Sequence, residues 1–556
     1  MTRNLYLLDA IQNWRTVPIL GVDTVRKVAR RISLFFGCER NIALRGVVMH
    51  LNRFVRWAIL VLALLSGSDS VRGQATPLKI TVHWNKVISV SKTTPTLQVV
   101  VNPPLRRGTP VHDNAFRALH DLGADYVRYV PWFPYPRLGV AELEAPKNGM
   151  TFWDFSVIDP MTIDFLEATK GHSVILNFST IPQWMYKTDK TVPYPDDPDK
   201  VVWDYEQGTE LRDPSFKEVA DYYTRLLSWY TKGGFTDELG KWHESGYHYS
   251  ISMWEVLNEV DFEHVMTPQT YTGLYDAVVT AMKKVQPDIK FVGAALAMPG
   301  KRPDFFEYFL NHKNHKPGIP LDFLSYHFYA VPTPDEPLDI QQHTVFAQAD
   351  GFLDTVRYIE SIRKRLSPET RTTIDEIGII SADDNGQDQP GHVTKPITEA
   401  YWNLAGAEYA YIFGVLETMG IDVAGESQLV GYPTQFPSVS MVDWKDGKPN
   451  ARLWVLKLLH DNCGRGDKLV EIAPSSSSAP AQPYIYSLAL VNEQGKRKIL
   501  LINKRDRDFG VSVVGAAGGQ LEAVDVTTGF QPPTAAKLAS DEFTLHGFSV
   551  AVVTLP

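Results

Sequence analysis

Two short stretches of the chain end in carboxylates that could act as a pair. Residues 251–261, ISMWEVLNEVD, predict a buried strand that ends abruptly in Asn258 and Glu259. Residues 371–380, RTTIDEIGII, predict a short β-branched strand with Glu376 near its end. Two carboxyl groups held together suit glycoside hydrolysis, in which one protonates the leaving oxygen and the other attacks the anomeric carbon or activates water.

The alternative is that neither glutamate is catalytic and that each is an ordinary loop carboxylate or a charge at a helix N-terminus. An Asn-Glu pair alone has a high false-positive rate, as any dipeptide motif does. The order of the surrounding elements favours chemistry, because each glutamate ends a strand and a helix follows it. Glu255, inside the first of these strands, also needs a partner, since a lone buried carboxylate is costly.

Strands and helices alternate through most of the chain. Apolar runs predict strands that begin near residues 96, 125, 172, 251, 289, 321, 371 and 420. Amphipathic stretches predict helices at residues 112–122, 160–170, 213–231, 268–285, 304–311, 341–366, 394–413 and 450–460. Eight such units predict an α/β fold, a closed (β/α)8 TIM barrel over residues 96–465. The fourth and seventh strands carry the two glutamates to the C-terminal face, where the active sites of such barrels lie.

The composition changes after Gly466. Residues 474–483, PSSSSAPAQP, predict a flexible connection. Short alternating runs then follow at residues 484–491, 498–503, 510–514, 521–525 and 548–555. They predict an accessory all-β, sandwich-like domain over residues 466–556. Residues 78–90 alternate in the same way before any helix, so we expect residues 74–95 to add strands to that domain.

The first 73 residues resemble a leader. Residues 49–73 contain Arg53 and Arg56, an apolar run from Trp57 to Leu65, and a small residue before Gln74, as in a secretory signal peptide. The apolar run is too short to span a bilayer as a helix. Residues 1–48 are basic and odd in front of such a signal, so translation starting at Met49 and mitochondrial targeting are both open alternatives. We expect a secreted, extracellular protein.

Composition describes a globular protein with a sizeable core, at 44% hydrophobic and 21% charged residues. Residues 1–73 hold 11 basic and 4 acidic residues, so their removal would change the formal charge from −9 to −16. Such a surface disfavours nucleic acid as a partner. Of the two cysteines, Cys38 lies in the leader and Cys463 in the barrel region, so no disulfide is expected.

Several motifs together resemble one family. The run WEVLNE, the later DEIG, the strand end SYHFYA and a β domain built from both chain ends are similar to glycoside hydrolase family 39 of clan A, which includes β-xylosidases and α-L-iduronidases. The resemblance covers residues 78–556 in layout and only short stretches in motif. Val260 stands where the family has proline, and the segment around Glu376 matches only at the glutamate and its neighbours. The substrate is therefore not implied.

The resemblance implies a retaining double displacement, with Glu259 as the acid/base and Glu376 as the nucleophile. By the same analogy, Arg128 and Tyr329 would support the nucleophile, and Asn258 would donate to the sugar 2-hydroxyl. A retaining mechanism predicts carboxyl groups about 5 to 5.5 Å apart.

Each supporting residue also has a structural interpretation. Arg128 could simply pair with Glu255 inside the barrel, and His327, a candidate for substrate binding, could be a satisfied core histidine. Asp375 should point away from the site, because neighbouring strand residues face opposite ways. Two groups of candidates lie on predicted loops or near the eighth strand. They are Trp132 and Trp184, expected to stack on sugar, and Glu426, which could contact substrate.

The leading hypothesis is a secreted retaining glycoside hydrolase acting on cell-wall oligo- or polysaccharides. A catalytically silent carbohydrate-binding protein on the same scaffold and a transglycosylase are the alternatives. No cofactor and no metal are expected, since His312 and His315 lie among lysines without acidic or cysteine ligands. The expected partner is the carbohydrate substrate, with no stable membrane insertion; the oligomeric state stays open.

Overall fold

The barrel is the larger part of the computed structural model, which describes residues 77–205, 209–333, 336–389, 391–473 and 484–556. Its parallel strands are β3 (Thr94–Val100), β4 (Val127–Val130), β5 (Val174–Leu176), β8 (Met253–Glu255), β9 (Lys290–Leu296), β10 (Phe323–Tyr326), β12 (Arg371–Ile379) and β13 (Val423–Glu426). Each pairs with the next in the chain, and β13 pairs with β3, so the sheet closes on itself. The leader predicted for residues 1–73 lies outside the described residues.

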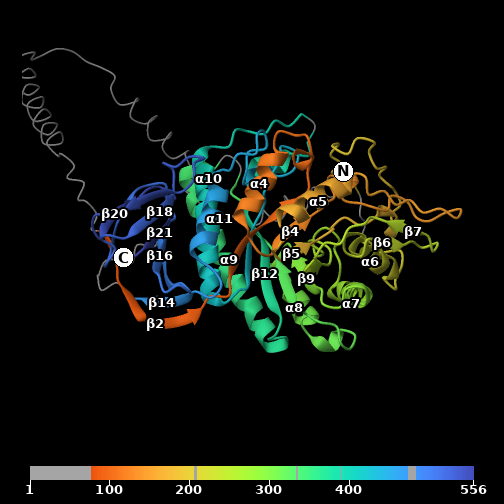
Figure 1. The fold of residues 1–556 in the computed structure, drawn as a ribbon, viewed down its shortest axis with the longest axis horizontal. Helices are drawn as coiled ribbons and strands as arrows, with labels where there is room; N and C mark the ends of the chain where they lie inside the picture. Colours follow the sequence, from red (N-terminus) through yellow and green to blue (C-terminus); the bar gives the residue numbers. More distant parts are fainter. Residues whose placement is uncertain (1–76, 206–208, 334–335, 390, 474–483) are drawn as a thin grey trace, which may run out of the picture. The chain divides into compact units, whose positions relative to one another are not determined.

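Helices follow the strands and surround the barrel (Figure 1). They are α4 (His112–Leu122), α5 (Ile158–Ala168), α6 (Lys217–Thr231), α7 (Pro268–Val285), α8 (Pro303–Phe309), α9 (Leu338–Leu366), α10 (Glu399–Met419) and α11 (Ala451–Asn462). Local sequence sets their ends: Thr267 caps the first turn of α7 ahead of Pro268, and Gly420 ends α10 with a left-handed backbone. None of the helices among the described residues is long and apolar enough to cross a membrane.

The predicted barrel is confirmed, with local differences. The predicted sixth strand is interrupted at His327, so β10 is continued by a short segment, β11 (Phe328–Ala330), which pairs with β12. Helix α6 begins at Lys217, later than predicted, because Phe216 adopts a left-handed backbone with φ of 62°. A hairpin of β6 (Gly234–Thr236) and β7 (Trp242–Glu244), which the sequence pattern did not predict, lies between α6 and β8.

Short 3-10 turns connect several of these elements. They are η1 (Pro103–Leu105), η2 (Pro136–Leu138), η3 (Gln183–Met185), η4 (Pro299–Lys301), η5 (His312–Asn314), η6 (Ala382–Gly386) and η7 (Pro437–Val439).

The second part is a pair of sheets. Seven strands lie in the order β19-β18-β21-β16-β15-β14-β2, and three in the order β1-β17-β20. Their bounds are β1 (Leu78–Ile80), β2 (Val82–Val90), β14 (Lys468–Ile472), β15 (Ile485–Val491), β16 (Arg497–Asn503), β17 (Phe509–Val513), β18 (Gln520–Val524), β19 (Thr534–Lys537), β20 (Glu542–Leu545) and β21 (Val550–Thr554). The two sheets share one apolar core, which includes Ile80, Ile499 and Val511.

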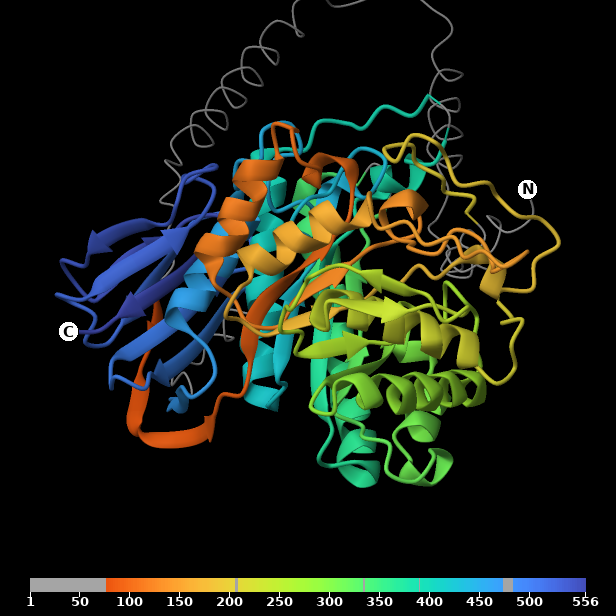
Figure 2. The same ribbon diagram turned by 45° about the vertical axis from the view of Figure 1, so that its right-hand side comes forward.

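Both ends of the described chain contribute to this β domain. β2 pairs with β14, and β1 pairs in parallel with β17. Figure 1 shows β2 running beside β14, and Figure 2 shows the same pair of strands from a second angle. The chain thus enters the barrel from the β domain and returns to it afterwards.

The barrel and the β domain are joined by buried and polar contacts. Helix α10 packs against β16, and the Arg505 guanidinium donates to the Gln342 carbonyl at 3.1 Å. Glu417, at the end of α10, is buried and accepts from the Ser91 hydroxyl at 2.8 Å, ahead of β3. Burial raises the pKa of Glu417 to about 8, and the nearby Asp467 adds to this shift.

The contacts across this junction predict the result of truncation. Deleting residues 467–556 removes the strands that pair with β1 and β2 and uncovers the apolar side of α10. We expect the truncated protein to be insoluble, measured as the soluble fraction after expression next to the full chain. A soluble and fully active truncation would contradict the prediction.

Glu417 predicts a pH-dependent loss of stability. Its pKa is higher folded, about 8, than in the unfolded chain, so the folded state holds this proton more tightly. The stability that it contributes is therefore complete at acidic pH and is lost as pH rises toward 8, at about 1.4 kcal/mol per pH unit at most. Glu417→Gln should match the parent protein near pH 5 and exceed its Tm near pH 8.

The control for this experiment is Glu369→Gln, which changes an exposed glutamate in the turn between α9 and β12. Its difference from the parent in thermal unfolding should stay small at both pH values. An equal Tm difference for Glu417→Gln at pH 5 and pH 8 would contradict a buried, proton-holding carboxyl group.

Candidate active site

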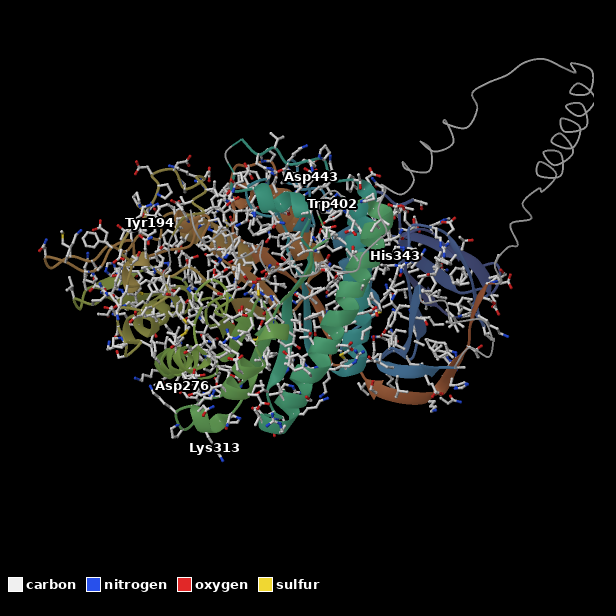
Figure 3. The ribbon with its side chains drawn as sticks, turned by 180° about the vertical axis from the view of Figure 1, so that it is seen from behind. Tyr194, Asp276, Lys313, His343, Trp402 and Asp443 are labelled. Atoms are coloured by element: carbon white, nitrogen blue, oxygen red, sulfur yellow. The ribbon has the colours of Figure 1, made fainter. Side chains whose placement is uncertain are left out.

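A cluster of charged side chains occupies the carboxyl ends of the barrel strands. The barrel's two ends are distinguished in Figure 3, where Asp443, in the segment after β13, lies toward the top of the view and Lys313, in η5 before β10, lies at the bottom. The cluster is drawn from β4, β8, β10, β11 and β12 and from the residues that directly follow them. Its members are Arg128, Glu255, Asn258, Glu259, His327, Tyr329, Asp375 and Glu376.

Arg128 lies at the centre of this cluster. Its side chain is fully buried, with Nε 2.5 Å from Glu255 Oε2 and Nη1 2.5 Å from Glu376 Oε1. Nη2 donates to Asn258 Oδ1 at 2.6 Å. Arg128 therefore pairs with Glu255, as its structural interpretation required, and also holds the candidate nucleophile and the asparagine of the Asn-Glu pair.

Burial and the charge of Arg128 act in opposite directions on the pKa of Glu255. Burial raises the pKa of Glu255 to about 7, and Arg128 limits the rise. Burial by itself would lower the pKa of Arg128, but the carboxylates around it outweigh that effect, so the guanidinium stays charged.

Glu259 reaches the site through an unusual backbone. Leu257 and Glu259, on either side of Asn258, both have left-handed conformations, with φ of 61° and 42°. Such conformations cost about 1–2 kcal/mol for residues other than glycine and are often found where function needs them. They bend the chain after β8 so that Asn258 contacts Arg128 while Glu259 contacts His327.

His327 connects the two halves of the cluster. Its Nδ1 lies 3.0 Å from Glu259 Oε1 and 3.6 Å from Glu376 Oε2, and its Nε2 lies 3.4 Å from Asp375 Oδ1. Burial lowers the pKa of His327, but the charges and hydrogen bonds of these carboxylates raise it well above its usual value. His327 is thus both a buried residue and a direct neighbour of both candidate catalytic groups.

The prediction that Asp375 points away from the site is wrong. Asp375 accepts from Ser325 at 2.6 Å and lies beside His327 and 3.8 Å from Arg128. The pairing of β12 with β13 shifts register between Ile374 and Ile377, so strict alternation fails there. Both Asp375 and Glu376 consequently reach the buried cluster.

Glu376 receives a hydrogen bond on each oxygen. Arg128 donates to Oε1, and the Tyr329 hydroxyl donates to Oε2 at 2.6 Å. Burial raises the pKa of Tyr329 well above its usual value, and the charge of Glu376 adds to the rise, so the phenol stays a donor at neutral pH. Glu376 is nearly buried, at 7% exposure.

Glu259 has the opposite electrostatic setting. Burial raises its pKa, the hydrogen bond to His327 opposes the rise, and the charge of Glu376 reinforces it. One oxygen of Glu259 and one of Glu376 lie within 4.8 Å of each other and of a His327 nitrogen. The two strand-end glutamates are therefore neighbours, as their positions in the sequence predicted.

The same three donor atoms are close enough to hold a metal ion. The charges around them favour an acid–base cluster instead, because Arg128 already neutralises Glu376 and His327 carries a raised pKa. Sequence spacing could not reveal this grouping, since Glu259 follows β8, His327 follows β10 and Glu376 lies within β12.

Glu263 is a site residue that sequence reasoning missed. Its Oε1 accepts from Trp132 Nε1 at 2.7 Å and from Asn258 Nδ2 at 2.9 Å. Burial raises its pKa to about 8, and the neighbouring Glu259 contributes to this rise. The only sequence signal was a further acidic residue four positions after Glu259.

Of the two tryptophans expected to stack on sugar, Trp132 contacts a residue of the candidate site, and the described contacts of Trp184 lie elsewhere. Trp132 is tied to the cluster through Glu263 and contacts the rings of Trp203 and Phe436. Trp184 instead donates to the Glu142 carbonyl at 3.2 Å and packs under the Arg212 guanidinium.

Glu426, considered as a substrate contact, is fully buried and pairs with Arg452 at 2.8 Å. The expectation that it could contact substrate is wrong in this structure, because its carboxylate faces the α11 side of the barrel wall.

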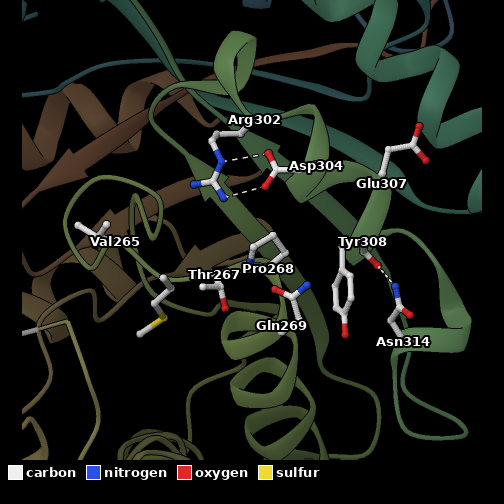
Figure 4. Close-up of a pocket in the computed structure, with 10 residues that line it drawn as sticks. Val265, Thr267, Pro268, Gln269, Arg302, Asp304, Glu307, Tyr308 and Asn314 are labelled. Carbon is white, nitrogen blue, oxygen red and sulfur yellow. Dashed lines mark hydrogen bonds and ion pairs between the residues drawn. The ribbon is translucent and has the colours of Figure 1, made fainter.

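A separate surface hollow of about 670 Å³ lies at the start of α7. Figure 4 shows it bordered by Thr267, Pro268 and Gln269 on one side and by the paired Arg302 and Asp304 above. None of the ten residues that line it belongs to the charged cluster.

A parallel eight-stranded barrel with paired carboxyl groups at its C-terminal face is the fold and site of a TIM-barrel enzyme. Comparison with known proteins shows which family of such enzymes the chain resembles. Residues 70–379 match the model of glycosyl hydrolases family 39, a span that includes Glu259 and Glu376. The chain therefore belongs to this family.

The similarity to one curated relative is partial. A β-xylosidase from Caldicellulosiruptor saccharolyticus is 26% identical over 209 residues, or 38% of this chain and 37% of that protein. The chain thus matches little more than a third of the relative's length.

Solved structures show a similar fold at low identity. A family 51 α-L-arabinofuranosidase from Bifidobacterium longum has a TM-score of 0.58 at 14% identity, with 87% of this chain and 100% of that chain covered. A GH51 arabinofuranosidase from Xanthomonas axonopodis pv. citri has a TM-score of 0.57 at 12% identity, with 86% and 99% covered. These likenesses concern the fold alone.

The central position of Arg128 predicts a large cost for its removal. Arg128→Met leaves Glu255, Asp375 and Glu376 without their buried cation, and breaking a buried pair in this way costs roughly 3–5 kcal/mol. The free energy of unfolding from urea titration should fall by that amount at pH 7. The loss should shrink at pH 5, because protonated carboxyl groups no longer need the cation.

A matched control is Arg107→Met, which breaks an exposed pair with Asp164. This change should cost under about 1 kcal/mol, since solvent screens surface pairs. Equal losses for the two variants would show that Arg128 is not the electrostatic centre of the barrel.

Proposed function

We propose that this protein is a retaining glycoside hydrolase, with Glu259 as the acid/base and Glu376 as the nucleophile. The observation that carries the proposal is the opposite setting of two neighbouring carboxyl groups. Glu376 accepts a hydrogen bond from a guanidinium and another from a phenol, whereas burial raises the pKa of Glu259. Groups with such divergent environments suit an attacking carboxylate and a proton donor.

In the first step, Glu376 attacks the anomeric carbon while Glu259 gives its proton to the departing glycosidic oxygen. A covalent glycosyl ester on Glu376 and a free alcohol result. In the second step, Glu259 takes a proton from water as that water attacks the same carbon, and Glu376 leaves as a carboxylate. The close approach of the carboxyl groups, within 4.8 Å for one oxygen of each, supports this retaining course rather than inversion.

The surrounding residues have roles in keeping with these steps. Asn258 is fixed by Arg128 and Glu263, which leaves a second amide hydrogen for a substrate hydroxyl. His327 contacts Glu259 and can pass a proton to it or remove one. Trp132 supplies an aromatic surface next to Glu263. For Trp184, which lies under Arg212, the structure offers no link to these steps.

The substrate and the location are parts of the same proposal. We propose a cell-wall oligo- or polysaccharide as substrate, with β-xylosides as the first class to test because the curated relative is a β-xylosidase. Secretion rests on the signal-like residues 49–73 of the sequence.

Two substitutions test the assignment by role. Glu376→Ala should abolish turnover of every aryl glycoside, because no glycosyl-enzyme can form. Glu259→Ala should lose much less activity, by about 10²-fold or more, on substrates with activated phenolate leaving groups than on those with alkoxide leaving groups, which need protonation. The measurement is kcat/KM on aryl glycosides of xylose, arabinose, galactose, glucose and uronic acids, next to alkyl glycosides of the same sugars, whose leaving groups are alkoxides.

Azide gives the stereochemical control. It should rescue Glu259→Ala with a glycosyl azide of retained configuration, and Glu376→Ala, if at all, with inverted configuration, as read by NMR. Equal loss in both variants on all leaving groups, with no azide product, would assign these residues structural roles. If the parent protein hydrolyses none of the glycosides in the panel but still binds sugar, a catalytically silent binding protein is favoured. If it transfers the sugar to added alcohols in preference to water, a transglycosylase is favoured.

A further inference from the structure

Two buried residues outside the predicted site contact Arg128 and Tyr329, the two residues that donate hydrogen bonds to Glu376. Gln98 lies on β3, and Ser427 directly follows β13, and both are fully buried. The Ser427 carbonyl accepts from Arg452, and its amide donates to Ile377 at 2.9 Å, so its position in the barrel wall is fixed. Neither residue has a part in the mechanism described above.

The orientation of the Gln98 amide is determined by Arg128. Arg128 Nη1 lies 2.8 Å from Gln98 Oε1, and a guanidinium can only donate. The amide oxygen must therefore face Arg128, and the amide nitrogen faces the other way. There, Gln98 Nε2 donates to Ser427 Oγ at 2.6 Å.

This donation sets the direction of the next hydrogen bond. The Tyr329 hydroxyl is oriented to donate both to Ser427 Oγ, 2.6 Å away, and to Glu376 Oε2, also 2.6 Å away. It has a single proton, so it can donate to only one of these neighbours at a time. If Tyr329 gave its proton to Ser427, Glu376 Oε2 would lose the tyrosine as a donor, and the serine proton would have no acceptor among the described residues. If Ser427 donates to Tyr329, each donor and acceptor in this series of side chains has a partner.

We infer that Gln98 and Ser427 are positioning residues that direct the Tyr329 proton onto Glu376. With Ser427 as the donor to Tyr329, the hydrogen bonds run one way around a closed circuit, from Arg128 through Gln98, Ser427 and Tyr329 to Glu376, whose other oxygen accepts from Arg128 again. A carboxylate that accepts two fixed hydrogen bonds is stabilised in its charged form and held in one orientation.

The circuit rests on the proposed function, since it concerns the nucleophile of that reaction. It gives a reason for the buried polar side chains of Gln98 on β3 and Ser427 directly after β13. The other titratable groups that interact with Glu376 are His327, 3.6 Å away, Glu259 and Glu263. Their described hydrogen bonds and ion pairs do not involve Gln98 or Ser427.

The experiment compares Ser427→Ala with Ser427→Thr. Ser427→Ala removes the donor to Tyr329, so the carboxylate of Glu376 loses support, and the acidic limb of the pH profile of kcat/KM should move up by about one pH unit. At a pH below the optimum, kcat/KM should fall about 10-fold, mostly in kcat. Ser427→Thr keeps the hydroxyl and should restore the parent profile.

Two further variants define the circuit. Gln98→Leu, which leaves Ser427 without its donor, should move the acidic limb in the same direction. Thr96→Val removes, from the same strand, a buried hydroxyl that has no hydrogen-bond partner among the described residues, and it should leave the profile unchanged. If Thr96→Val shifts the limb as far as Ser427→Ala, the effect is general packing and the inference is overturned.

A measurement independent of turnover separates this inference from the proposed function. With ¹³C-carboxyl glutamate in the full chain and Glu376→Gln for assignment, NMR follows the titration of Glu376 directly. Its midpoint should rise by about one pH unit in Ser427→Ala and stay at the parent value in Ser427→Thr. An unchanged midpoint in Ser427→Ala refutes the circuit even if the protein hydrolyses sugars, whereas a shifted midpoint in an inactive parent protein refutes only the proposed function.

Discussion

One buried cation organises the inside of this barrel. Arg128 is fully enclosed and contacts Glu255, Glu376, Gln98 and Asn258 through three different nitrogens. A buried guanidinium is tolerated only when its hydrogen bonds are well formed and its charge is balanced, and the carboxylates need it for the same reason. The separate environments of the two strand-end glutamates follow from this arrangement, because Arg128 binds Glu376 and leaves Glu259 to His327.

The barrel could be predicted from the sequence because its strands are buried on both faces. Continuous apolar runs alternating with amphipathic helices leave few other folds, and two glutamates at strand ends then fall on one face. The β domain was harder. Strand β19, TAAK, is exposed throughout and has no alternating pattern, so its pairing with β18 decides its structure rather than its own sequence.

The candidate site was predictable only where a motif marked it. Glu259 and Glu376 followed from strand ends and family resemblance, but Asp375 did not, because a register shift in β12 breaks the alternation that the prediction used. Glu263, Gln98 and Ser427 carry no motif. Their importance comes from contacts between strands distant in sequence, which no spacing rule contains.

The return of the chain to its starting sheet has a consequence for biosynthesis. On the ribosome, β2 emerges early, but its partner β14 follows only after the whole barrel has been made. Until then the strand has unpaired backbone groups, and three of its apolar residues, Val87, Ile88 and Val90, remain exposed even in the finished protein. For most of its synthesis the nascent chain therefore carries an unpaired strand with apolar residues, the kind of segment that exposes incomplete chains to aggregation.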